Sequence, residues 1–139
     1  MCPVYINRIA SIHAESRNEK PYFSAQEPDY KEMITNANLR RRMSRMIKMG
    51  VACGLECLKD IPSEKVDAII TATGLGCLAD TEKFMNALMD NREQMLNPTA
   101  FIQSTFNTVG AQLALLLKIH AYNVTYCLLY TSPSPRDTR

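Results

Sequence analysis

The five cysteines have the most chemistry to offer in this chain, because a thiolate is both a nucleophile and a ligand for soft metals. Their odd number and apolar surroundings favour reduced thiols over a disulfide framework. Cys53 and Cys57 lie one helical turn apart, which suits a metal pair, but no second Cys or His pair lies nearby. We therefore interpret both as buried core thiols and expect no metal and no cofactor. The full set is Cys2, Cys53, Cys57, Cys77 and Cys127.

Gly74-Leu75-Gly76 follows an apolar run and suggests nucleotide binding, because glycines let a backbone approach phosphates at a helix N-terminus. The third glycine of that fingerprint is missing, so a strand-to-helix turn is the simpler interpretation. A small nucleotide-binding α/β domain is kept as an alternative. His13 and His120 stand alone, and no Ser/His/Asp set converges by spacing.

The composition describes one soluble globular domain, with 46% apolar and 22% charged residues in 139. A net charge of +2 and a pI near 8.3 are too mild to indicate a nucleic acid or an acidic membrane surface as partner. No run approaches the roughly 20 apolar residues of a membrane span, and no signal peptide is recognisable. We expect a cytoplasmic protein.

The first half of the chain predicts one short strand and one long helix. Residues 4–6 are β-prone, and the polar residues 13–38 read as a long surface loop. Apolar residues at helical spacing then predict a helix over residues 39–59. Gly50 and Gly54 share its apolar face, which indicates close packing against a neighbouring element.

The second half alternates strands and helices. Residues 66–73 are a nearly continuous apolar run, which is typical of a strand covered on both faces. Asp80 or Thr81 can cap a helix to residue 91, with Phe84, Leu88 and Met95 pointing inward. After a break at Asn97-Pro98, residues 99–105 read as a loop, a central helix follows from Asn107 or Thr108 to His120, and residues 124–126 form a strand. This order predicts an α/β layered fold.

The last residues have a different composition. CLLYTSPSPRD, residues 127–137, resembles a translated sequencing-library adapter, and Thr138-Arg139 would be index sequence. We exclude such segments from fold reasoning. The expected division is therefore a truncated domain over residues 1–126 and a disordered, adapter-derived segment over residues 127–139.

ATGLGCLADTEKFMNAL (residues 72–88) and NPTAFIQSTFNTVGAQLALLLKIHAYNVTY (residues 97–126) together resemble the N-terminal half of β-ketoacyl synthases. The nearest likeness is to divergent bacterial 3-oxoacyl-ACP synthases of aryl-polyene type. RRMSRMIKMGVACGLECLKD (residues 41–60) and residues 4–7 fit the same family, so the resemblance covers residues 1–126.

The resemblance implies the first half of a thiolase-like αβαβα fold that works as a dimer. It implies acyl transfer through a cysteine thiolate to a carbanion made by decarboxylating malonyl-acyl carrier protein, in fatty acid or polyene biosynthesis. The implied partners are acyl carrier protein, acyl thioesters, and a second copy or a ketosynthase partner subunit. A non-catalytic, chain-length-factor-like subunit is the alternative.

Within that family the nucleophile follows the strand at residues 123–126, so Cys127 occupies a tempting place. The adapter interpretation removes it, and we expect no catalytic residue in this chain, because the nucleophile and histidines would lie farther along the parent protein. The resemblance places residues 99–107 near the acyl pocket and dimer interface. The expected contacts there are Phe101, Gln103, Thr105 and Asn107.

Overall fold

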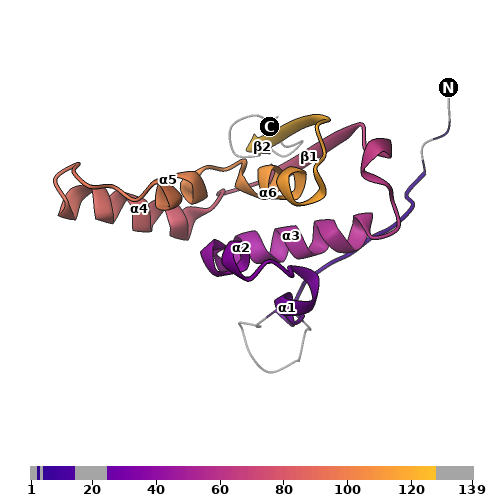
Figure 1. The fold of residues 1–139 in the computed structure, drawn as a ribbon, viewed down its shortest axis with the longest axis horizontal. Coiled ribbons are helices and arrows are strands. Elements are labelled where there is room, and N and C mark those ends of the chain that lie inside the picture. Colours follow the sequence, from indigo (N-terminus) through magenta and orange to yellow (C-terminus); the bar gives the residue numbers. More distant parts are fainter. Residues whose placement is uncertain (1–2, 4, 15–24, 128–139) are drawn as a thin grey trace, which may run out of the picture.

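The computed structural model describes residues 3, 5–14 and 25–127, and the predicted tail therefore lies outside the described residues apart from Cys127. Two parallel strands and several helices confirm the predicted α/β class (Figure 1). In chain order the elements are α1 (Tyr30–Met33), α2 (Ala37–Arg42), α3 (Arg45–Leu58), a 3-10 turn (Ser63–Lys65), β1 (Ala68–Thr73), α4 (Leu78–Asp90), α5 (Pro98–Ser104), α6 (Thr108–Leu117) and β2 (Tyr122–Cys127).

The two predicted strands form one parallel pair. Ala68 lies opposite Tyr122 and Thr73 opposite Cys127, so both strands end at the same edge. β1 begins at Ala68 rather than at residue 66 because the 3-10 turn just before it occupies the connection. Parallel strands need a long crossover, and α4, α5 and α6 provide it.

α6 is the central element that the sequence predicts. It packs against α3 on one side and against both strands on the other (Figure 1). Thr71 and Asn123 face it, since a Cβ built on Gly110 would meet side-chain atoms of both residues. The core lies between these layers. Its buried apolar residues are Ile34, Met43, Ile47, Val51, Ile69, Cys77, Leu113 and Ile119.

The predicted close approach of the long helix to a neighbour is confirmed at both glycines. A Cβ on Gly50 would lie 2.7 Å from Val109 Cγ1, and one on Gly54 would lie 2.5 Å from Leu113 Cδ1. Real Cβ atoms do not approach other atoms so closely. The absent side chains of α3 therefore set its distance from α6.

The outer face of the sheet contradicts the prediction that β1 is covered on both faces. Ile70 is 66% exposed, and Tyr122 and Tyr126 on β2 are 64% and 46% exposed. Side chains alternate along a strand, and α6 covers the side that carries Thr71. An apolar run thus indicates that both faces of the strand can be buried, but among the described residues nothing covers the outer face.

The predicted helix over residues 39–59 is wrong in its continuity. α2 ends at Arg42, Met43 after it has an extended backbone, and α3 starts after Ser44. The apolar residues keep helical spacing across the break, because the side chain of Met43 is 4% exposed and packs in the same core as Ile47. Serine favours the position before a helix, although Ser44 makes no side-chain capping bond here.

The N-terminal predictions are also wrong where the structure describes them. Of the predicted strand at residues 4–6, residue 4 lies outside the described residues, and Tyr5 and Ile6 belong to no strand and are 75% and 81% exposed. Arg8, farther along the chain, forms ion pairs with Glu56 on α3 and with Asp60 just after it. Within the predicted loop of residues 13–38, of which 15–24 lie outside the described residues, capping by Asp29 and Asn36 starts α1 and α2.

The crossover differs from prediction at three points. α4 starts at Leu78, not after Asp80, because Thr81 Oγ1 donates to the Cys77 and Ser104 carbonyls instead of capping. Residues 98–104 are helical rather than a loop, since Asn97 caps them and proline suits a first turn.

Of the three residues predicted to point inward, Phe84 and Leu88 are partly buried. Met95 is 98% exposed, because left-handed backbone at Arg92, Glu93 and Met95 turns the chain outward.

Within the described residues, no single helix is both long and apolar enough to cross a membrane. Only the pair α5 and α6 has the necessary length and composition together, and the two are bent by 109°.

Gly54→Ala should destabilise the fold by about 1 kcal/mol. Overpacking against Leu113 costs roughly 1–3 kcal/mol, and alanine's better helix propensity recovers about 0.5–1 kcal/mol. Gly74→Ala is the matched control, because a Cβ there meets no atom within 4 Å. Urea unfolding of both variants measures the difference, and equal midpoints would contradict the packing account.

Acid should weaken the contact between residue 27 and α3. Hydrogen bonds from Tyr30, at 2.7 Å, and from Arg45 lower the pKa of Glu27 below 4.5, in that order of effect. Because the pKa of Glu27 is lower in the folded protein than in the unfolded chain, its ionised carboxylate stabilises the fold above pH 4.5. This stabilisation is lost as the pH falls through the folded-state pKa. Glu27→Gln should therefore flatten the acid limb of stability against pH. Glu64→Gln, at an exposed carboxylate outside the described ion pairs, should leave that limb unchanged.

Candidate functional site

The candidate site lies at the carboxyl ends of the two parallel strands. Thr73 and Cys127 are in register there, and the turn Gly74-Leu75-Gly76 leads directly from β1 into α4. Open α/β sheets bind ligands beyond the carboxyl ends of their strands. The side chain of Cys127 lies outside the described structure, so its backbone alone is placed.

The glycine turn brings β1 against the junction of α5 and α6. Gly76 has a φ of +61°, and its N–H donates to Thr73 Oγ1 at 2.9 Å. A Cβ on Gly76 would lie 3.3 Å from Phe106 Cβ. Glycine is thus needed there both for its backbone conformation and for this contact.

A cavity of about 380 Å³ lies beneath this junction, between α3, β1 and α6. Its lining is mostly apolar and includes Met46, Gly76, Phe106 and Val109. The polar groups in it are threonines, and Thr71 Oγ1 hydrogen-bonds to Thr125 Oγ1 across the strands. Such a space suits a hydrocarbon chain better than a charged ligand.

The structure places the four predicted contact residues on α5 and on the turn after it. Phe101 is 56% exposed, and its ring centroid lies 5.5 Å from that of Phe84 on α4. Gln103 is half-buried, and Asn107 is exposed and precedes α6 without a side-chain capping bond. Their role at a pocket or an interface stays a prediction.

Thr105 has a structural role in the turn. Its Oγ1 donates to the Ile102 carbonyl at 2.8 Å and lies 2.9 Å from Thr108 Oγ1. Thr108 Oγ1 in turn lies 2.7 Å from the Ile102 carbonyl and 2.9 Å from the Thr105 carbonyl, and this residue is 2% exposed. Buried hydroxyls therefore fix the angle between α5 and α6.

The sequence analysis did not identify two apolar residues beside this turn as part of the site. Phe106 is 56% exposed although it lines the cavity, and Leu75 in the glycine turn is 67% exposed. With Phe101 and Ile102, 54% exposed, they give the α5–α6 junction an apolar surface. The glycine turn was the signal for Leu75, because a tight turn projects its middle side chain.

Neither Cys53 nor Cys77 is an activated nucleophile. Burial, and then the Asp80 carboxylate, raises the pKa of Cys77, and burial is the main cause that raises the pKa of Cys53. A nucleophilic cysteine needs the opposite shift. His13 Nδ1 lies 3.2 Å from Ser11 Oγ and His120 is exposed, and in the described structure neither histidine hydrogen-bonds a cysteine.

The sequence profile of the β-ketoacyl synthase N-terminal domain matches residues 13–125. The chain belongs to this family. Its fold is accordingly part of the thiolase-like αβαβα layered fold, as the resemblance implied.

A chain in the solved complex of the ketosynthase ApeO with its chain length factor ApeC, from Xenorhabdus doucetiae, is similar in structure. The TM-score is 0.57 at 21% identity, with 76% of this chain covered. The chain spans 40% of the length of that matched chain. A search of functionally curated proteins gave no match.

Thr108→Val should destabilise the protein by about 0.5–1.5 kcal/mol, because it removes a buried hydroxyl whose single proton is donated to either the Ile102 or the Thr105 carbonyl. Thr99→Val makes the same change on α5, where the hydroxyl forms none of the described bonds, and should stay within about 0.5 kcal/mol. Thermal and urea unfolding measure both variants. Equal losses would show that the hydroxyl network does not fix the turn.

Proposed function

We propose that the chain supplies the first half of the scaffold of a ketosynthase-like acyltransferase, which condenses an acyl group with malonyl-acyl carrier protein in fatty acid or polyene biosynthesis. The main support is the site itself within a chain of this family. Both strands end beside a glycine turn, close to an apolar cavity and to the exposed Phe106 that lines it.

The proposed reaction has two bond exchanges. A cysteine thiolate takes the acyl group from its carrier, forming a new thioester and releasing the carrier thiol. Malonyl-acyl carrier protein then loses CO₂, and the resulting carbanion attacks the enzyme thioester, whose sulfur leaves as thiolate. The nucleophile, two basic side chains and an oxyanion hole are assigned to the part of the parent protein that has no counterpart here.

The described residues would act by shape rather than by proton transfer. Phe101, Gln103, Thr105 and Asn107 are proposed to line the acyl pocket or the contact with a partner subunit, and the fixed α5–α6 angle would hold them in place. The partners would be acyl carrier protein, acyl thioesters, and a second copy or a related subunit. Because that chemistry depends on soluble acyl carrier protein, we place it in the cytoplasm.

A chain-length-factor-like subunit is the second candidate. The observation that favours it is that the similar ketosynthase was solved with such a subunit. A subunit of this kind would shape the cavity without forming an acyl-enzyme. The residue in the nucleophile position of the parent protein separates the two candidates.

We further propose that residues 127–139 derive from a sequencing adapter. In the genomic sequence, the codons that follow Tyr126 should not encode CLLYTSPSPRD. The same read would give the residue in the nucleophile position. Genomic sequence that encodes CLLYTSPSPRD would overturn this proposal while leaving the family unchanged.

The 139-residue chain should form no acyl-enzyme when incubated with acyl-acyl carrier protein, because burial raises the pKa of the Cys53 and Cys77 thiols and the proposed catalytic groups belong to the rest of the parent protein. The parent protein should gain one acyl group per active site by intact mass, and its nucleophile Cys→Ala variant should gain none. Acylation of Cys127 in the short chain, tested against Cys127→Ser, would contradict this. A parent protein that stays unacylated would favour the chain-length-factor-like subunit.

A further inference from the structure

Two thiols on α3 are unused by the proposed function. Cys53 and Cys57 both lie within the continuous helix Arg45–Leu58. Both are free, and both are partly exposed instead of being buried core residues as the sequence suggested. The buried cysteine is Cys77. The pair is therefore accessible from solvent.

The helix holds the two thiols at a chelating distance. Residues four apart on a helix have Cβ atoms about 5–6 Å apart on the same face. Two metal–thiolate bonds of about 2.3 Å in a line need sulfur atoms about 4.6 Å apart, which ordinary side-chain rotation about each Cβ provides. Cys57 lies near enough to influence the ionisation of Cys53 electrostatically.

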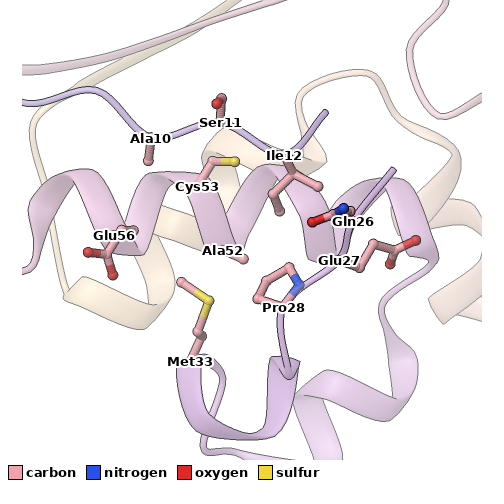
Figure 2. A pocket seen from close by; sticks show the side chains of 10 residues that line it. All are labelled: Ala10, Ser11, Ile12, Gln26, Glu27, Pro28, Met33, Ala52, Cys53 and Glu56. Carbon is pink, nitrogen blue, oxygen red and sulfur yellow. The ribbon is translucent and has the colours of Figure 1, made fainter. Parts of the chain in front are cut away.

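A cavity gives access to this face of α3. Figure 2 shows Cys53 among the residues that line a space of about 490 Å³ between α3, residues 10–12 and residues 26–28. Ala52 and Glu56 are the other α3 residues in its lining. A small ion can thus reach the helix beside Cys53.

The surroundings favour a soft cation of low coordination number. Among the described residues, no group of three or more His, Cys, Asp or Glu side chains is placed to hold a metal, which excludes a four-ligand zinc site there. Thiolate ligands favour Cu(I) and zinc among the first-row metals, and of these two only Cu(I) commonly accepts two ligands. Glu56 and Asp60 oppose the single charge of Arg8 along the same helix surface, so the local charge favours a cation.

We propose that Cys53 and Cys57 form a two-thiolate site for one soft monovalent cation of the Cu(I) type on the outer surface of α3. Binding forms two metal–sulfur bonds, and each thiol releases its proton to solvent. The metal keeps its oxidation state, so no oxidant or reductant is consumed. The site lies on α3, apart from the carboxyl ends of the strands, and is independent of the acyl chemistry.

Anaerobic titration of the full chain with Cu(I), in competition with a coloured Cu(I) chelator, tests the site. The background carries Cys2→Ser, Cys77→Ala and Cys127→Ser, which leaves Cys53 and Cys57 as its thiols. Alanine replaces the buried Cys77 without placing an unpaired hydroxyl in the core. One equivalent should bind, with release of two protons.

Cys53→Ser and Cys57→Ser should each weaken binding by more than about tenfold, since even outer-shell changes cost about 10–100-fold in metal affinity. Circular dichroism checks that each variant keeps its helices. Absent binding in the background, or retained affinity in either single variant, would overturn the two-thiolate site.

Discussion

The contact between α3 and α6 is the constraint on which the rest of the structure depends. Gly50 and Gly54 let the two helices meet with Val109 and Leu113 packed against bare backbone. α6 can then lie close enough to α3 to cover the inner face of the sheet at Gly110 while α3 closes the core behind it. A side chain at either glycine would push α6 outward and lift the α5–α6 junction from the glycine turn.

Predictions from the sequence were correct where a short stretch of residues determines the local structure by itself. The apolar run ending at Thr73 became a strand, and the glycine pair on α3 correctly indicated a close neighbour. The alternation of strands and helices was sufficient for the fold class. Short motifs quoted in order along the chain led to the family, which the profile match then showed.

Predictions were wrong where tertiary contacts decide. Helical spacing continues through Met43 because a break in the backbone still lets its side chain reach the core. Residues 5 and 6 have strand propensity without a strand partner. The candidate site was expected only through the family, and the role of Phe101 in it stays a prediction. Phe106 was missed because its contact with Gly76 joins segments distant in sequence.

The parallel pairing of β1 with β2 also determines the order in which the helices and the sheet can form during synthesis. Thr71 and Thr125 meet across 54 positions of chain, so β1 leaves the ribosome long before its partner exists. Loop closure of that length has an entropic cost that only the completed α6 packing offsets. During synthesis, the helices from α3 to α6 are available first and the sheet is the last layer to close. Until then the backbone groups along the edge of β1 that pairs with β2 lack their partners, and an unpaired strand edge of this kind is where a growing chain is most open to pairing with another chain.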